Sequence, residues 1–313
     1  TRVYPTEENQ LHLTLNFAGP TDTTHYVGLG FVNVILDGAE LGGGVTCTAN
    51  YGFAYKNKIR TEQLSMQHCK GEADEFAALS GYGFDLYECS FTENQNGVQV
   101  YWPPYTDRLY SDIYDCKFNN NTGFGLKVSK EFRAYLTDCE FIGNTVGLYM
   151  PFDIISSLYR TKVQARGCDF INNRTGISNF MENPADIPII PDPNNSLDLD
   201  LCLIQGHTES GIRLYNTLLS ISRSEIIQNT SPLDGGGLYF YTSKTFDTTS
   251  EIIRISSTTF DKNHSSKNGG GLYFNSEHGT SNVFVRNTIT ENTADLCGGG
   301  LYVRMGDYGE HSD

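Results

Sequence analysis

Two short elements of alternating apolar and polar residues recur along the chain. The first reads small residue, one gap, large apolar residue, two gaps, then Asn, as in Cys89–Asn94, Cys116–Asn121, Cys139–Asn144 and Cys168–Asn173. The second is a Gly followed by an apolar, any, apolar triplet, as in Gly125–Val128. Because alternation with period two places successive side chains on opposite faces, both elements are predicted to be β-strands. The Asn and Gly between them favour sharp bends, since both tolerate a positive φ.

The first element recurs ten times, at variable distances along the chain. Its other copies, some of them degraded, are Val45–Asn50, Leu64–Cys69, Cys202–His207, Ser224–Asn229, Thr258–Asn263 and Asn287–Asn292. The spacing between successive large apolar residues ranges from 19 to 34 residues. Constant strands with variable connections predict an all-β fold, a right-handed parallel β-helix of about ten coils with loops at its corners. At about 4.8 Å per coil, the rod would be roughly 50 Å long.

Stacked coils place equivalent side chains directly above one another. We expect a column of large apolar side chains from Phe91 to Phe260 and a column of cysteines from Cys89 to Cys202. We also expect a ladder of buried Asn amides that bond the backbone groups left unpaired at the bends. His207 stands where this ladder would have an Asn, and we interpret it as a substitute for that residue.

The Phe-x-x-Asn element followed by Gly-Gly-x-Leu, as in Phe260–Asn263 and Gly269–Leu272, resembles the repeats of chlamydial-type polymorphic outer-membrane proteins. More broadly, the pattern looks like that of the pectin-lyase-like β-helix superfamily. The resemblance extends over roughly residues 45–303 and implies a β-helical region exposed at a cell surface. This chain has Gly at the third motif position where those repeats have Ala. The residues concerned are Gly237, Gly271 and Gly300.

The pattern divides the chain into two parts. Residues 1–44 lack the full repeat and hold two candidate strands, Leu11–Leu15 and Tyr26–Phe31, which are expected to cap the first coil. Residues 45–313 are expected to form the β-helix, and a Pro-rich insertion at residues 181–199 is its longest loop.

The C-terminal end of the repeat region shows no cap. The strand predicted at Gly300–Val303 is followed by only ten residues, and they contain nothing that resembles a capping element. An uncapped coil exposes unpaired backbone groups and apolar side chains. We therefore expect the rod to continue or another subunit to stack on it.

The charge and cysteine content narrow the class of protein. The net charge of −15, with no compensating basic cluster, argues against binding to nucleic acid or to an anionic membrane surface. The sequence has no run of 18 apolar residues, so no transmembrane helix is predicted. Eight cysteines and five Asn-x-Ser/Thr sequons favour the secretory route, and hence a secreted or cell-surface protein with N-linked glycans.

The five sequons differ in their suitability for a glycan. Asn173, Asn229 and Asn263 occupy the ladder position, where burial would prevent attachment. Asn120 precedes that position by one residue, so alternation turns it outward, and Asn194 lies in the insertion. Asn120 and Asn194 are therefore the preferred glycosylation sites.

The column of cysteines has two interpretations. Adjacent coils bring equivalent Cα atoms to about 4.8 Å, within the range of a disulfide. Cys89, Cys116, Cys139 and Cys168 are thus candidates for bridges between coils, such as Cys89–Cys116 and Cys139–Cys168. In the alternative, they are buried free thiols that pack as small apolar groups.

No metal site or cofactor is predicted. No cysteines or histidines have the spacing of a zinc site. Asp186, Asp192, Asp198 and Asp200 supply oxygen ligands in and beside the insertion, but they lack the tight Asp-x-Asp-x-Asp-Gly spacing of a Ca²⁺ loop. An acidic surface loop is the preferred interpretation, with a Ca²⁺ site as the alternative.

One outward position of the Gly strands carries Tyr149, Tyr239, Tyr273 and Tyr302. Stacked and exposed, these side chains would form an amphipathic strip that binds glycan rings or another subunit. Tyr101 and Trp102 form a second aromatic patch on a loop. In the alternative, corner loops cover the column, or Tyr is present because it suits exposed strands.

Parallel β-helices often cleave polysaccharides, a reaction that needs convergent carboxylates. The chain lacks the polygalacturonase-like motifs, and Gly81–Asp85 matches only the first half of an alginate-epimerase signature. The sequence therefore favours a non-catalytic extracellular structural or adhesive protein, a subunit or segment of a surface fibre that assembles through its β-helix ends. Its expected partner is itself or a similar β-helix, with glycans as a further candidate. The alternative function is a lyase or glycoside hydrolase that acts on an acidic polysaccharide.

Overall fold

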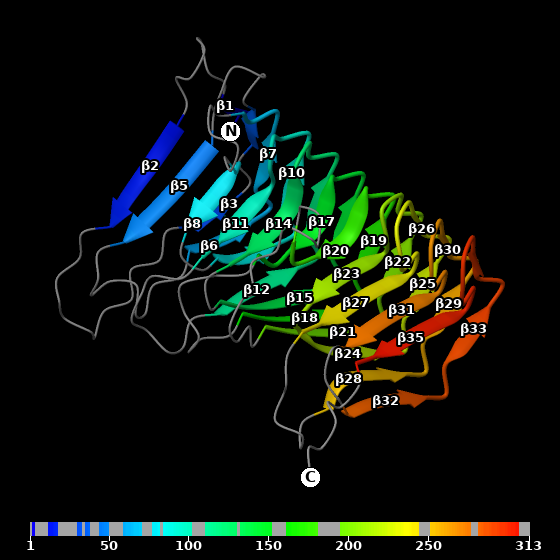
Figure 1. Cartoon of the computed structure of the whole chain (residues 1–313). Helices are drawn as coiled ribbons and strands as arrows, with labels where there is room; N and C mark the ends of the chain where they lie inside the picture. Colours follow the sequence, from blue (N-terminus) through cyan, green and yellow to red (C-terminus); the bar gives the residue numbers. More distant parts are fainter. Residues whose placement is uncertain are drawn as a thin grey trace.

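The computed structural model describes residues 2–3, 12–17, 30–32, 35–37, 44–49, 59–70, 77–81, 84–101, 110–129, 132–151, 161–180, 195–243, 251–276 and 281–306. Every regular element among them is a β-strand, and the strands pair in parallel. Figure 1 shows the coils following one another along a rod, from the blue β2 and β5 at one end to the red β35 at the other. The predicted all-β parallel β-helix is confirmed.

Three long sheets form the walls of the rod. The first sheet has 11 strands and contains the Phe-x-x-Asn elements. Its strands are β1 (Arg2–Val3), β4 (Ile35–Asp37), β7 (Ser65–Gln67), β10 (Ser90–Thr92), β13 (Lys117–Asn119), β16 (Glu140–Ile142), β19 (Asp169–Ile171), β22 (Leu203–Gln205), β25 (Glu225–Ile227), β29 (Thr259–Asp261) and β33 (Thr288–Thr290).

The second sheet also has 11 strands and contains the Gly elements. They are β2 (His12–Phe17), β5 (Gly44–Ala49), β8 (Leu79–Gly81), β11 (Val98–Val100), β14 (Phe124–Val128), β17 (Val146–Tyr149), β20 (Thr175–Ser178), β23 (Ile212–Tyr215), β27 (Leu238–Thr242), β31 (Leu272–Ser276) and β35 (Leu301–Met305). A small sheet of 3 strands lies between the first and second sheets along the chain. It consists of β26 (Thr230–Ser231), β30 (His264–Ser265) and β34 (Thr293–Ala294).

The third sheet has 10 strands and was not predicted. They are β3 (Gly30–Val32), β6 (Ile59–Glu62), β9 (Phe84–Tyr87), β12 (Tyr110–Tyr114), β15 (Arg133–Thr137), β18 (Lys162–Arg166), β21 (Ser196–Asp200), β24 (Leu218–Ser222), β28 (Glu251–Ser256) and β32 (Ser281–Val285). These strands alternate like the others: Ala134 and Leu136 of β15 point inward and are buried. The alternation is present in the sequence, but its inward residues range from Ser and Ala to Ile, so no recurring motif marks it.

Two sharp bends bound each strand of the first sheet from β7 to β33. Asp115 (φ 50°) lies at one end of β13 and Asn120 (φ 55°) at the other. In the next coil, Asp138 (φ 53°) and Gly143 (φ 69°) lie at the same two positions around β16. Most of these residues are not Gly, so the left-handed conformation has a cost that other interactions must offset. The residues that follow each bend supply those interactions.

The residue after the second bend forms the predicted Asn ladder. The side-chain amide of Asn144 donates to the carbonyl oxygen of Phe118 at 2.7 Å, and its Oδ1 accepts the backbone N–H of Asn121 at 3.0 Å. The backbone N–H of Asn144 in turn donates to Oδ1 of Asn173 at 2.8 Å. Bonds of the same kind recur at Asn94, Asn121, Asn229 and Asn263. The ladder thus satisfies the backbone groups that the bends remove from the sheets.

The residue after the first bend has a similar role with a smaller side chain. The hydroxyl of Ser224 accepts the backbone N–H of Cys202 at 3.1 Å and donates to the carbonyl oxygen two residues before it at 2.8 Å. Thr258 makes the same bond to the carbonyl two residues before it, at 3.0 Å. Cys, Ser and Thr interchange at this position because each is small and offers a group that contacts the bend.

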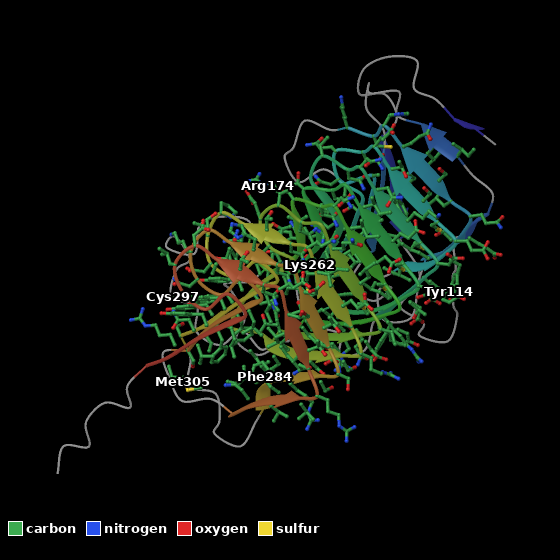
Figure 2. The ribbon with its side chains drawn as sticks, turned by 90° about the vertical axis from the view of Figure 1, so that its right-hand side faces the viewer. Tyr114, Arg174, Lys262, Phe284, Cys297 and Met305 are labelled. Atoms are coloured by element: carbon green, nitrogen blue, oxygen red, sulfur yellow. The ribbon has the colours of Figure 1, made fainter. Side chains whose placement is uncertain are left out.

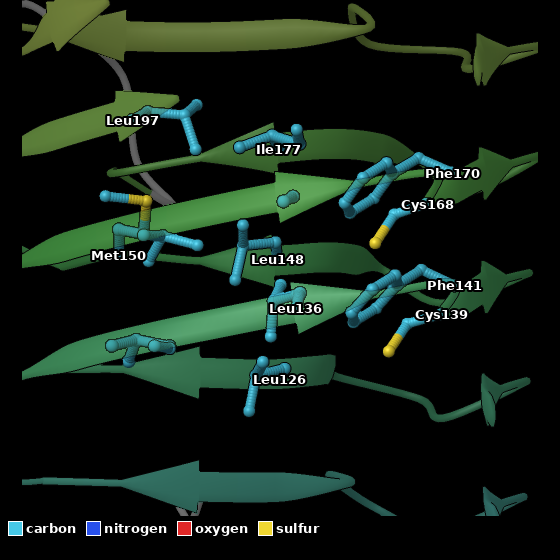
Figure 3. Close-up of a cluster of buried hydrophobic side chains, with 14 of the residues drawn as sticks. Leu126, Leu136, Cys139, Phe141, Leu148, Met150, Cys168, Phe170, Ile177 and Leu197 are labelled. Carbon is cyan, nitrogen blue, oxygen red and sulfur yellow. The ribbon is translucent and has the colours of Figure 1, made fainter. Parts of the chain in front are cut away.

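In-register stacking also builds the core. Four Phe rings stack with centroid spacings of 5.5, 4.7 and 4.6 Å and interplanar angles of 10° or less: Phe91, Phe118, Phe141 and Phe170. Figure 3 shows Phe170 above Phe141, with aliphatic side chains from the other two sheets beside them. Ile204 and Ile226 continue the column before Phe260 resumes it. The strands from β10 to β29 of this sheet therefore each contribute one large apolar side chain to the same buried column.

One predicted copy of the first element is wrong. The sequence predicts that Val45–Asn50 belongs with the Phe-x-x-Asn strands, but β5 lies in the second sheet, where Val45 pairs with Leu79. The strand of the first sheet in this region is β4, whose Leu36 pairs with Met66. The mistake arose because an alternating strand next to an Asn is too short a pattern to identify its sheet.

The ends and the insertion are only partly described. β2 and β5 pair in parallel and extend the second sheet, while the capping role of residues 1–44 stays a prediction. Residues 181–194 lie outside the described residues. Ser196–Asp200, most of which was assigned to the insertion at 181–199, instead forms β21 of the third sheet.

Candidate functional site

The tyrosines of the second sheet stack as the sequence predicts. Tyr239, Tyr273 and Tyr302 occupy equivalent positions in β27, β31 and β35. Their rings are almost parallel, with centroid spacings of 5.1 and 5.2 Å and interplanar angles of 3° and 2°. The spacing follows from the in-register pairing of the strands, which repeats the ring once per coil.

The exposure predicted for this column is wrong at two of its members. Tyr239 and Tyr273 are each only 8% exposed, and Tyr302 is half-buried. Each ring covers a face of the next, so the faces on which a sugar would stack are already occupied. Burial also raises the pKa of the Tyr239 and Tyr273 hydroxyls. The column is therefore not a continuous exposed strip, and its binding role stays a prediction.

The Gly-Gly-Gly turns explain how the tyrosines are packed. Gly235 has a φ of 71°, and a Cβ added there would lie 2.7 Å from the Cα of Tyr239. A Cβ added at Gly237 would lie 2.5 Å from the carbonyl oxygen of Gly271 in the next coil. The turn thus folds closely against the tyrosine, and the coils approach closely at the third Gly. This approach accounts for Gly rather than Ala at the third motif position.

Cations lie against the aromatic side chains in two earlier coils. The guanidinium of Arg213 is 4.8 Å from the ring centroid of Phe180 and 5.9 Å from that of Tyr239. Lys127 lies between Phe124 and Tyr149, at 5.7 and 5.8 Å from their ring centroids. Both cations occupy the outward position that Tyr has in other coils. Sequence reasoning did not identify the pairing of Arg213 with Phe180, although the shared strand position was a usable signal.

The second aromatic patch is described only in part. Tyr101 is half-buried at the end of β11, and its backbone N–H donates to the carbonyl oxygen of Gly81 at 3.1 Å. Trp102 lies outside the described residues. The role of this patch stays a prediction.

The last described coil exposes residues that the preceding coil buries. Leu301 and Val303 of β35 are 44% and 47% exposed, whereas their pairing partners Leu272 and Phe274 are 1% and 2% exposed. The other exposed apolar residues of this coil are Phe284, Val285, Ile289, Leu296 and Met305. Figure 2 shows Phe284 and Met305 at this end of the rod. These seven residues define the end surface. It cuts through internal columns at Phe284, Ile289, Leu301, Val303 and Met305, whose partners in the preceding coil are buried.

The sequons divide into those whose Asn belongs to the buried ladder and those whose Asn lies outside it. Asn173, Asn229 and Asn263 are at most 1% exposed, and their side-chain amides donate to backbone carbonyls at 2.8, 3.1 and 2.7 Å. Asn120 is exposed. Asn194 lies outside the described residues. Glycan attachment at any of them stays a prediction.

The predicted cysteine column is present. Cys89, Cys116, Cys139, Cys168 and Cys202 are free and buried. Figure 3 shows the sulfur atoms of Cys139 and Cys168 pointing the same way in adjacent coils. The structure thus has the free-thiol arrangement, and bridges between coils stay a prediction.

The acidic residues of β21 are engaged by cations. Asp198 lies 3.4 Å from Nζ of Lys162, and Asp200 forms an ion pair with Arg223 that lowers the pKa of its carboxyl group. Asp186 and Asp192 lie outside the described residues. Within the described ranges, no group of three or more His, Cys, Asp or Glu side chains is placed to hold a metal ion. In the same part of the chain, no helix is long and apolar enough to cross a membrane.

The comparisons with known proteins agree with the repeat. The sequence model of the Chlamydia polymorphic membrane protein repeat matches residues 257–275. This segment contains β29, the ladder residue Asn263 and the Gly269–Gly271 turn that precedes β31, so it covers one Phe-x-x-Asn element and the Gly element after it. No curated protein and no solved structure matches the chain significantly.

Proposed function

We propose that the chain is a non-catalytic structural or adhesive protein of a cell surface, which assembles end to end through its β-helix. The observation that carries this proposal is the in-register repeat, whose columns a further coil of the same kind would continue at the last described coil. Residues that are 1–2% exposed in the preceding coil have counterparts that are 44–47% exposed in the last described coil. Exposed apolar side chains of this kind are more stable in contact with another coil than in contact with water.

Backbone and side chains both favour a parallel coil as the occupant. The strands β32, β33 and β35 lie at the edges of their sheets, and an exposed edge is a template for a further strand. Each large apolar side chain that is fully covered contributes about 1.5–3 kcal/mol before the cost of association. The columns of Phe, Asn and small residues continue only if the incoming coil carries the same repeat. A further coil of the same repeat meets that requirement, whether it belongs to this chain or to a second copy of it.

The location is supported by different observations. The match of residues 257–275 is to a repeat of polymorphic membrane proteins of Chlamydia, as the description of the repeat states. Five sequons and eight cysteines are consistent with the secretory route. We therefore place the proposed function outside the cell. Adhesion to a partner would use the sides of the rod, where the outward-facing side chains of each sheet are largely polar.

Negative-stain electron microscopy of the purified chain tests the assembly. We expect filaments with a repeat near the length of one rod. Val303→Lys places a charge in the end surface and should leave single rods, because a buried unpaired ammonium is costly. Thr288→Lys is the matched control: it adds the same charge to the last coil, but Thr288 pairs with Thr259 on the outward side of β33. This control should form filaments like the wild type.

Single rods of the wild type at high protein concentration would contradict end-to-end assembly. Equal loss of filaments in both variants would also contradict it, because charge alone would then explain the effect. Circular dichroism confirms that each variant keeps its β content. Cleavage of an acidic polysaccharide by single rods would replace the proposal with the lyase or hydrolase alternative.

A further inference from the structure

The five cysteines after the first bend form one continuous line through the core. Their exposed fractions are 0–2%. The residues that follow them pair directly in successive strands: Ser90 with Lys117, Lys117 with Glu140, Glu140 with Asp169 and Asp169 with Leu203. Each Sγ also lies 3.2–3.5 Å from the carbonyl oxygen two residues before it, so the five side chains share one orientation.

Hydroxyl groups close this line at both ends. The hydroxyl of Thr61 contacts Sγ of Cys89 at 3.2 Å, and the hydroxyl of Ser224 follows Cys202. Three other cysteines of the described ranges lie elsewhere. Cys47 is in β5 of the second sheet, where it pairs with Gly81. Cys69 lies at the Asn-ladder position, where its N–H donates to Asn94 at 2.9 Å, and the exposed Cys297 precedes the last Gly-Gly-Gly turn. The line therefore holds an odd number of thiols.

Geometry limits which of these thiols can bond. A disulfide needs Cα atoms about 4.4–6.8 Å apart, and adjacent parallel strands are about 4.8 Å apart. Cysteines two coils apart are roughly 10 Å apart and cannot be joined. Only neighbours in the line can pair, so at most two bridges form together. The unpaired cysteine is then the first, third or fifth of the line.

We propose that this line is a redox-modification site: a disulfide oxidant converts it into two bridges between adjacent coils and one thiol, which is confined to Cys89, Cys139 or Cys202. Each bridge forms in two exchange steps with a small disulfide such as glutathione disulfide. One cysteine thiolate displaces a glutathione thiolate, and the second cysteine then displaces the other. Two cysteines are oxidised, and the glutathione disulfide is reduced to two thiols.

The remaining thiol can move along the line without further oxidant. The thiolate of Cys139 attacks Sγ of Cys116 in a Cys89–Cys116 bridge. The Cys116–Cys139 bond forms, and the old bond breaks with its electron pair on Cys89, which takes up the proton that Cys139 released. Each exchange thus moves the thiol by two coils, towards one end of the line or the other.

The electrostatics favour Cys89 as the reactive end. A hydrogen bond from the thiol of Cys116, with further help from Thr61, lowers the pKa of Cys89 to about 6. Burial raises the pKa of Cys116. In the fully reduced line, Cys89 is therefore the thiol that ionises most readily.

Peptide mapping after oxidative folding tests the inference. The full chain with Cys297→Ser, which removes the exposed thiol, is refolded from its reduced state in a glutathione redox buffer and quenched with acid. Its thiols are then alkylated and located. We expect one alkylated cysteine per line, distributed over Cys89, Cys139 and Cys202, and none at Cys116 or Cys168.

Two serine variants give opposite outcomes. Cys139→Ser leaves two complete pairs, so alkylation of the line should fall to zero. Cys116→Ser isolates Cys89, so the number of alkylated cysteines should rise from one to two. Serine fits this position, because Ser224 already makes its hydrogen bonds there. Circular dichroism confirms that both variants fold.

Alkylation of Cys116 or Cys168 in the folded wild type would overturn the pairing rule. Five alkylated cysteines per line would show a purely structural column of free thiols. Disulfides between Cys69 and a cysteine of the line would show that the line does not pair only within itself. These outcomes are independent of the proposed function, because filament formation depends on the end surface and not on the cysteines.

Discussion

His207 is the residue at which the Asn ladder changes its chemistry. Its backbone N–H still donates to Oδ1 of Asn229 at 3.1 Å, and its Nδ1 lies 3.1 Å from the carbonyl oxygen of Asn173. Its Nε2 is buried and has no hydrogen-bond partner among the described residues. An Asn at this position would use both its amide oxygen and its amide nitrogen, so His207 leaves one polar atom of the ladder without a hydrogen bond.

His207→Asn should therefore stabilise the protein and weaken its response to acid. Burial lowers the pKa of His207 to about 4, whereas an unfolded His binds its proton near pH 6.5. As the pH falls through this window, the unfolded chain gains a proton that the folded one excludes, so stability is lost. Between pH 7 and pH 5 the wild type should lose about 2 kcal/mol more of its free energy of unfolding than the variant. Urea unfolding at both pH values measures the difference, and equal losses would contradict the prediction.

The buried sequons lead to a prediction about glycans. When the chain is secreted from a eukaryotic host, Asn120 should carry a glycan, and Asn173, Asn229 and Asn263 should not. A glycan on any of these three would remove a ladder amide and prevent the coils from closing, so such chains should not be secreted in folded form. Mass spectrometry of the secreted protein locates the glycans, and Asn120→Gln serves as the control that removes one. Folded protein glycosylated at Asn229 would contradict this account.

At the scale of the element, the strands are short and the coils are held by close backbone contacts. β16 has three residues between two bends with positive φ. The Gly before each strand of the second sheet lets the coils approach: a Cβ at Gly147 would lie 2.6 Å from the carbonyl oxygen of Gly176 and 3.2 Å from the ladder amide of Asn173. A coil can therefore vary its loops more freely than its Gly and Asn positions.

Gly147→Ala should destabilise the protein by about 1–3 kcal/mol, because the added methyl group forces two backbones apart. Glu140→Ala is a suitable control in the same coil. Glu140 is partly exposed and pairs with Lys117 at 3.4 Å on the surface, so its loss should change stability by less than about 0.5–1 kcal/mol. The midpoints of urea unfolding give both values. If the two substitutions lowered the free energy of unfolding equally, the close approach of the coils at Gly147 would not limit the size of the side chain there.

At the scale of the whole molecule, the rod is a one-dimensional stack. Each coil contacts chiefly the coils before and after it, as the strand order of the three long sheets shows. Stability in such a stack is a sum over coils and over the contacts between neighbours. β14 is paired on both sides, whereas β35 is paired only with β31. A coil that is paired on one side only, as at either end of the described rod, is therefore less stable than a coil inside it.

Hydrogen exchange should report this gradient in single rods. Amides of β35 should exchange at least about 100-fold faster than those of β14, because one-sided pairing lowers the free energy of local opening. The measurement is made on the Val303→Lys variant and on dilute wild type, in which the ends are uncovered. In filaments, the protection of wild-type β35 should rise towards that of β14. Equal protection of both strands in single rods would contradict the claim that the stability of a coil depends on pairing with neighbours on both sides.

The sequence by itself determined the parallel β-helix and the identity of its columns. The alternation of apolar and polar residues with period two indicates which side chains of a strand point inward. The repeated bends align equivalent residues of successive coils. The stacking of Phe91 on Phe118 and the Asn ladder could therefore be predicted. The third sheet was missed because its inward residues carry no shared motif. The sheet of β5 was misassigned because one short strand looks like another.

Only the tertiary structure decided what covers each outward or terminal side chain. Tyr239 points outward from its strand, yet it is buried by Tyr273, Phe180 and the Gly235 turn, and no local pattern encodes those neighbours. Leu301 and Leu272 have the same sequence environment but exposed fractions of 44% and 1%. Exposure depends on whether another coil lies above, which is a property of the stack and not of the strand.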